Sequence, residues 1–172
     1  FEKADFHSNL PLQFLAAAVG LMLVVMELGL AQWPVFYGAA PNLSLIFIYY
    51  MMIYHNKLLP IFSIFIIGII GDFLLSDLLG GRATALMLLA IIMRVRLFKL
   101  QQGDFSLLWI DFGVSCGLVS AFQLILFSIL NIAIPSINPI LFQYGVNLIL
   151  FPIGFVMIFA VHQLMQKLKL VG

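Results

Sequence analysis

This 172-residue sequence has few charged residues. Asp, Glu, Lys and Arg make up 9% of it, while 64% of it is hydrophobic. Soluble domains carry about 25% charged and about 45–50% apolar residues. Eight basic and seven acidic side chains cannot cover so much apolar surface against water. The composition excludes a soluble globular fold and predicts an integral membrane protein.

Cysteine, clustered basic charge and metal-ligand patterns are also scarce. The single cysteine, Cys116, lies in an apolar run, which excludes a disulfide framework and a cysteine-rich metal site. A net charge of +1 argues against nucleic acid, which requires a clustered basic face. His7, His55 and His162 lie far apart and have no acidic neighbours at ligand spacing. The sequence has no phosphate-binding glycine loop either, and we predict no metal and no cofactor.

Long apolar runs separated by short polar breaks fill the sequence instead. A membrane-spanning helix needs about 20 residues, so the length allows about six. The runs are continuous and rich in Leu, Ile, Met and Ala, unlike the alternating strands of a membrane barrel. We therefore predict an all-α bundle of six transmembrane helices in a single domain covering residues 1–172. The spans are expected at about 12–33, 43–54, 60–79, 83–97, 105–132 and 140–165.

The basic residues near the span ends predict the orientation. Six spans leave only Arg82 on one side of the membrane, and the positive-inside rule makes the other side cytoplasmic, with both termini there. A five-span topology would move one basic group outside, and we reject it for that reason. Arginines and lysines at the inner ends form a collar that can contact anionic lipid headgroups or a cytoplasmic protein. The basic residues placed inside are Lys3, Lys57, Arg94, Arg96, Lys99, Lys167 and Lys169.

Three acidic residues fall within the predicted spans. Glu27 and Asp72 lie in the outer halves of the first and third spans, and Asp111 lies in the inner half of the fifth. Ionisable groups at this depth cost roughly 2.5–3.5 kcal/mol on insertion scales and usually face the bundle interior. Our main interpretation is paired or protonated acids that fix helix register; a proton or cation relay and a contact with a partner protein are the alternatives. The partners expected from matching depth are Arg82 for Asp72 or Asp77, and Arg94 or Arg96 for Asp111.

Small residues and one proline indicate helix packing. Gly113 and Gly117 are four residues apart, so one face of their helix is flat enough for a second helix to approach closely. Gly68 and Gly71 are expected to act similarly on the third span. Pro152 falls in the middle of the sixth span, where it should kink the helix.

Patterns of catalysis are weak. Gly113-Val114-Ser115-Cys116-Gly117 matches the letters of a nucleophile elbow, but that motif requires a strand-to-helix turn and this stretch lies within a helix. An intramembrane serine protease using Ser115 and His162 is a remote alternative, because nothing nearby supplies an oxyanion hole. Gly71-Asp72 is similar to intramembrane aspartyl proteases, which need a second aspartate at the same depth. We predict that the protein is not an enzyme.

The third span and its neighbours resemble a specific family. The run Gly68-Ile-Ile-Gly-Asp72-Phe-Leu-Leu-Ser-Asp-Leu-Leu79-Gly80-Gly-Arg82, leading into Ala83-Thr-Ala-Leu86, resembles the central signature of the rod shape-determining protein MreD family. Pro41-Asn42, and Val146-Asn147 followed by Pro152, match two further features. Asp77 and the doubled glycine at 80–81 depart from the pattern. The candidate binding residues, in structural or partner contacts, are Glu27, Pro41, Asn42, Gly68, Gly71, Asp72, Gly80, Arg82, Asn147 and Pro152.

The resemblance implies a non-enzymatic adaptor in the inner membrane of a bacterium, within the machinery that elongates the cell. Its implied partner is a bitopic MreC-like scaffold, beside the MreB filament and the cell-wall synthase pair of a glycosyltransferase and a penicillin-binding transpeptidase. The implied role is support of rod shape and lateral peptidoglycan synthesis. The family is also similar to the substrate-binding membrane subunits of vitamin transporters. The alternative function is therefore a small-molecule transporter subunit with an outward pocket near Glu27, Asp72 and the 131–140 loop.

Overall fold

The computed structural model describes residues 10–34, 41–55, 58–75, 80–101, 104–131 and 137–169, and the elements within these ranges are helices. The helical part of the fold prediction is confirmed. The helices are α2 (Leu10–Ala31), α3 (Leu43–Tyr54), α4 (Ile61–Leu74), α5 (Gly81–Gln101), α6 (Phe105–Asn131) and α7 (Ile137–Lys169).

Helix boundaries follow the polar and proline breaks in the sequence. Helix α3 has the bounds expected for the second span, beginning after Asn42 and ending at His55. Pro60 precedes α4 in an extended conformation with ψ 153°, which suits the residue before a first helical turn. Helix α4 ends at Leu74, before the predicted boundary; residues 76–79 lie outside the described residues. Helices α5 and α7 extend beyond their predicted spans at both ends.

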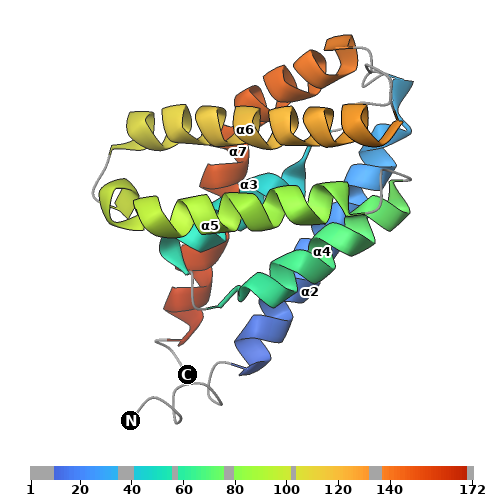
Figure 1. Cartoon of the computed structure of the whole chain (residues 1–172). Helices are drawn as coiled ribbons and strands as arrows, with labels where there is room; N and C mark the ends of the chain where they lie inside the picture. Colours follow the sequence, from blue (N-terminus) through green and yellow to red (C-terminus); the bar gives the residue numbers. More distant parts are fainter. Residues whose placement is uncertain are drawn as a thin grey trace.

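Helix α3 forms the centre of the molecule. Helices α2, α5 and α7 pack directly against it, α4 packs on α2 and α5, and α6 packs on α5 and α7 (Figure 1). Every residue from Ser44 to Ile53 is buried, and nearly all of them are apolar. A helix that is apolar on all sides is stable only inside a bundle or a membrane. The composition of α3 therefore accounts for its central position.

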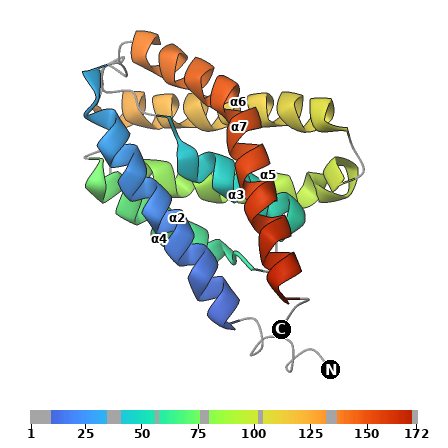
Figure 2. The same cartoon turned by 180° about the vertical axis from the view of Figure 1, so that it is seen from behind.

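Consecutive helices run in opposite directions, as Figures 1 and 2 show from two sides. One end of the bundle contains the C-terminal ends of α2, α4 and α6 and the N-terminal ends of α3, α5 and α7; we call it the Arg82 end. The opposite end is called the Arg96 end. Helix α7 changes direction near its middle, in the part that contains Pro152. This bend agrees with the expected proline kink.

Aromatic rings fill the core between α3, α6 and α7. Tyr49 lies edge-on to Phe112 and Phe151, with ring centroids 5.2 and 5.6 Å away. Phe112 and Phe151 stack at 4.1 Å, and Phe155 extends the cluster toward Tyr50. Paired aromatic rings contribute about 0.5–1.5 kcal/mol beyond their buried area, so this cluster joins the three helices firmly.

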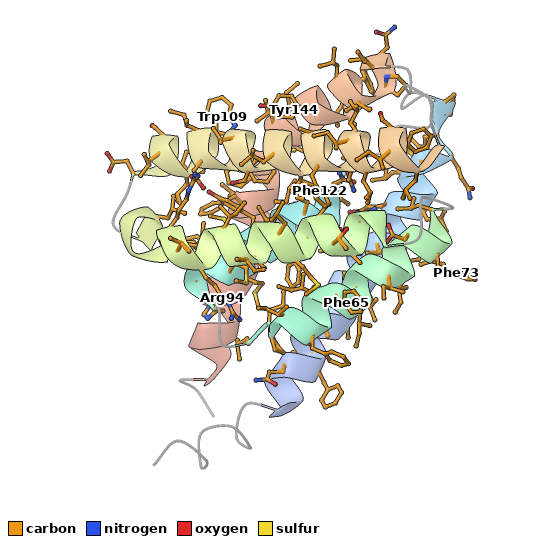
Figure 3. The ribbon with its side chains drawn as sticks, in the orientation of Figure 1. Phe65, Phe73, Arg94, Trp109, Phe122 and Tyr144 are labelled. Atoms are coloured by element: carbon orange, nitrogen blue, oxygen red, sulfur yellow. The ribbon has the colours of Figure 1, made fainter. Side chains whose placement is uncertain are left out.

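The outside of the bundle is apolar, as the side chains in Figure 3 illustrate. Phe73 on α4 is 76% exposed, and Trp109 on α6 also lies on the surface. Stretches of α2, α6 and α7 (Gln13–Ala31, Phe105–Leu130 and Ile137–Ala160) are long and apolar enough to cross a membrane. Helices α3 and α4 are apolar but shorter. Together, these helices are those of a membrane protein.

Candidate functional site

Two neighbouring groups of polar contacts lie toward the Arg82 end, and together we call them the polar network. The first begins with a carboxylate on α4. Asp72 accepts hydrogen bonds from the backbone N–H groups of Gly80 and Arg82, both at 2.9 Å, and of Ala83 at 3.3 Å. These N–H groups belong to the first turn of α5 and the residue before it, and they have no partner within the helix. Gly80 turns the chain with a φ of +87°, a left-handed conformation that favours glycine. Asp72 thus caps the helix that follows its own.

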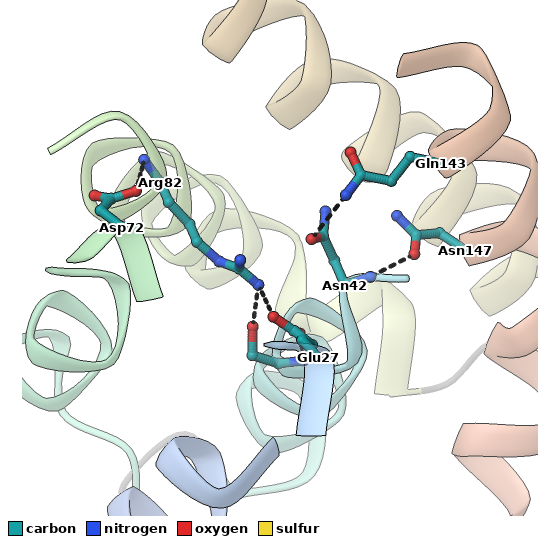
Figure 4. Close-up of polar contacts among 7 residues, drawn as sticks. Glu27, Asn42, Asp72, Arg82, Gln143 and Asn147 are labelled. Atoms are coloured by element: carbon teal, nitrogen blue, oxygen red, sulfur yellow. Dashed lines mark hydrogen bonds and ion pairs between the residues drawn. The ribbon is translucent and has the colours of Figure 1, made fainter. Parts of the chain in front are cut away.

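A second carboxylate caps the central helix from α2. Glu27 accepts a hydrogen bond from the backbone N–H of Ser44, in the first turn of α3, at 2.6 Å. Its other oxygen forms an ion pair with the guanidinium of Arg82, which also donates to Ser44 Oγ at 2.8 Å (Figure 4). Glu27 is 1% exposed, Ser44 0% and Arg82 6%. The N-termini of α3 and α5 carry partial positive charge, so both caps place an anion where the helix dipole favours one.

Amide side chains form the second group, which involves α6 and α7. The backbone N–H of Asn42 donates to Asn147 Oδ1 at 2.8 Å, and Gln143 Nε2 donates to Asn42 Oδ1 at 3.3 Å. Asn147 is fully buried and its amide donates to the sulfur of Cys116 at 3.6 Å. Figure 4 shows the two groups side by side, one from α2, α4 and α5 and one from α7, with the start of α3 between them.

Close backbone approach explains the glycines of α4. A Cβ atom added to Gly68 would lie 2.4 Å from the Cα of Ala83, so the backbones of α4 and α5 leave no room for a side chain. A Cβ on Gly71 would lie 3.2 Å from Cδ of Arg82. These two glycines let α5 pass close enough for the Arg82 side chain to reach Glu27.

Glycines of α6 face α7. A Cβ on Gly113 would lie 3.1 Å from Leu148, and a Cβ on Gly117 would lie 3.7 Å from the ring of Tyr144. The Tyr144 hydroxyl donates to the carbonyl of Gly113 at 3.2 Å. The flat face expected on this helix is present, and α7 of the same chain occupies it.

A smaller polar cluster lies at the Arg96 end. Asp111 accepts hydrogen bonds from Arg96 Nη1 and from the Tyr49 hydroxyl, each at 3.1 Å, and Tyr49 also approaches the carbonyl of Leu108 at 3.1 Å. The pairing of Asp111 with Arg94 or Arg96 is confirmed, with Arg96 as the partner. The Arg96 side chain is 44% exposed, so this pair is far more accessible than that of Arg82.

The predicted partner of Arg82 requires a correction. The Arg82 guanidinium pairs with Glu27 of α2, and Asp72 contacts only the backbone of residue 82. The reason is geometric: the N–H groups at the start of α5 point at Asp72, while the Arg82 side chain passes Gly71 of α4 and ends between Glu27 of α2 and Ser44 of α3. Asp77, the alternative partner, lies outside the described residues.

The two candidate prolines border or bend helices near this network. Pro41 is buried just before α3, and its carbonyl accepts from Leu43 N–H at 3.1 Å. Pro152 lies within α7 beside the buried Phe151. Sequence reasoning missed Ser44 and Gln143. A serine two positions after the Pro41-Asn42 break was a usable signal, since such residues favour helix N-termini.

Possible reactive groups do not gather at the network. Ser115 is 2% exposed and its hydroxyl has no hydrogen-bond partner, but the side chain of His162, its imagined base, lies outside the described residues. Among the described residues, no three His, Cys, Asp or Glu side chains are grouped to hold a metal ion. Both oxygens of Glu27 and both of Asp72 already accept hydrogen bonds from the protein. The arrangement is suited to holding helices in position.

No known family model matches the chain, and searches of the curated proteins and of the solved structures gave no significant match.

Proposed function

We propose that this protein is an MreD-like adaptor of the bacterial cell-elongation machinery, a non-enzymatic protein of the inner membrane that binds an MreC-like bitopic scaffold. One observation carries the proposal. Residues of the three separate stretches that resemble the family, including Asp72, Arg82, Asn42 and Asn147, lie in two neighbouring groups of polar contacts on either side of the start of α3. Residues far apart in sequence that lie close together in the structure are expected of a family signature that specifies a fold.

The chemistry of the network supports an adaptor more than a catalyst or a transporter. Buried ion pairs contribute little net stability, because desolvation offsets their attraction, but they penalise arrangements that separate the partners. Glu27 and Arg82 thereby favour one arrangement of α2, α3 and α5. A rigid bundle with an apolar surface presents a fixed face to another protein's transmembrane helix. A polar ligand would have to displace existing bonds from Glu27 or Asp72.

Six membrane spans with both termini in the cytoplasm belong to the same proposal. Six helices of alternating direction would bring both termini to the same side of the membrane. Arg94 and Arg96 lie toward the C-terminal end of α5, whereas Arg82 at its other end is neutralised by Glu27. The Arg96 end is therefore the cytoplasmic one under the positive-inside rule.

Two short helices set a condition on this topology. Helix α3 has 12 residues and α4 has 14, or about 18 and 21 Å of helix against a hydrocarbon core of about 30 Å. Because α3 is enclosed by other helices, its ends need not reach the lipid surface. A periplasmic reporter fused after residue 172 should be inactive, and a cytoplasmic one active.

The test of function is co-purification. The tagged chain is extracted from its native membrane in mild detergent, and proteins and small molecules are identified together by mass spectrometry. We expect an MreC-like bitopic protein, with the glycosyltransferase, the transpeptidase or the MreB filament as further components. Recovery of an ATP-driven module or a bound vitamin instead would contradict the adaptor and favour the transporter subunit.

A further inference from the structure

The proline inside α7 frees a backbone carbonyl. In an α-helix the N–H of each residue donates to the carbonyl four residues earlier. Pro152 has no N–H, so the carbonyl of Leu148 lacks the donor that position 152 would otherwise supply. Lipid tails offer no donor either, and within a membrane such a freed group has to be satisfied by a neighbouring helix.

The indole of Trp109 on α6 supplies the missing donor. Its Nε1–H donates to the carbonyl of Leu148 at 3.1 Å. Trp109 lies four residues before Gly113 and therefore on the same face of α6, the face where a Cβ on Gly113 would lie 3.1 Å from the Leu148 side chain. Tryptophan often anchors a helix to the lipid interface. Here its polar N–H is instead used within the protein, at the carbonyl that the proline frees.

The two halves of α7 are held in different ways. After the bend, Phe151 and Phe155 are buried in the aromatic cluster. Before the bend, none of residues 137–146 is buried. Directed polar contacts hold that half: the Tyr144 hydroxyl donates to a carbonyl of α6, and Asn147 accepts from the N–H that precedes α3. The angle between the halves, visible in Figures 1 and 2, therefore depends on a few hydrogen bonds near the bend.

We propose that Pro152 and Trp109 form a joint in α7. Pro152 provides the pivot, and the Trp109 indole takes the place of the missing backbone donor and holds the first half of the helix at one angle. That angle brings Asn147 beside the start of α3, where the second group of the polar network forms. Trp109 is thus a positioning residue, which acts on that group through α7.

A distance across the bend tests the joint. Nitroxide labels are attached to Leu141→Cys and Met157→Cys in the full chain with Cys116→Ser, reconstituted in lipid bilayers. Both labelled positions are exposed, at 61% and 64%, and they lie on opposite sides of Pro152. Double electron–electron resonance should give one narrow distance distribution when the joint is intact.

Removal of the indole donor should loosen the joint. Trp109→Phe keeps an aromatic ring and removes the N–H. Because one interhelical hydrogen bond in a membrane is modest, the fraction of molecules outside the original distance should rise roughly three- to fifteen-fold. Trp33→Phe is the matched control, since Trp33 is the other tryptophan of the chain and is 61% exposed. It should leave the distribution unchanged.

Restoring the backbone donor should make Trp109 dispensable. Pro152→Ala returns an N–H to position 152, which can satisfy the carbonyl of Leu148 within α7. In this background Trp109→Phe should no longer broaden the distribution. A role of the Trp109 ring in packing alone would give the same broadening in both backgrounds.

The remaining outcomes also decide the matter. If Trp109→Phe keeps the original distribution, or broadens it equally with and without Pro152, the joint is wrong. If Trp109→Phe does not fold, a folded double variant with Pro152→Ala supports the joint, and an unfolded double variant contradicts it. None of these readouts involves the scaffold, so failure of the joint leaves the proposed adaptor function standing.

Discussion

Replacing Glu27 with glutamine should lower the free energy of unfolding by far more than the loss of an exposed ion pair would. Glu27 and Arg82 are 1% and 6% exposed, so the substitution leaves a guanidinium buried without a counter-ion. Breaking a buried pair by removing one partner typically costs about 3–5 kcal/mol. The amide oxygen of glutamine can still accept from the Ser44 N–H, so the expected loss comes from the ion pair.

The double variant makes this prediction specific. Glu27→Gln with Arg82→Met removes both charges, and replacement of a whole buried pair is often neutral or even stabilising. We expect the double variant to be more stable than Glu27→Gln alone. The assay is the free energy of unfolding of the purified protein in mixed micelles, followed through increasing denaturing detergent.

Asp111→Asn provides the matched control. Its partner Arg96 is 44% exposed, and exposed pairs are worth about 0–1 kcal/mol. If Glu27→Gln and Asp111→Asn lose equal stability, or if the double variant is the least stable, the reasoning about burial is refuted.

Further substitutions test the packing and the caps by the same unfolding measurement. Gly68→Ala should destabilise by about 1–3 kcal/mol, because its Cβ would lie 2.4 Å from backbone, whereas Gly29→Ala, with nothing within 4 Å, should be neutral or stabilising; equal effects would contradict this. Asp72→Leu should lose about 0.5–2 kcal/mol or more as the cap of α5 is removed, and an unchanged protein would show that the cap contributes nothing. Ser115→Ala removes a buried hydroxyl without a partner, so we expect no loss of stability and less disruption than Gly68→Leu or Gly71→Leu cause. A fluorophosphonate should not label Ser115. Labelling would revive the protease hypothesis.

The sequence predicted the helices well because their signals are local. Apolar runs and breaks such as Pro41-Asn42 depend on neighbouring residues, and α3 was placed at its observed bounds. The pairing of Asp111 with Arg94 or Arg96 followed from depth alone, and the structure selects Arg96. The direction in which a buried side chain extends was harder to predict. Depth matched Arg82 to Asp72, and only the packing of α2 against α3 and α5 reveals that its side chain meets Glu27.

The remaining misses have the same physical origin. Ser44 and Gln143 are ordinary polar residues in sequence, and they matter because the start of α3 lies between Glu27 and α7. Such relations require the packed structure.

The most direct test of the adaptor is quantitative recovery of the MreC-like scaffold from native membranes by three tagged chains. The wild-type and Ser115→Ala chains should recover it equally, and Gly68→Leu, which separates α4 from α5, should recover much less. Failure of both well-folded chains to recover any scaffold would contradict the account.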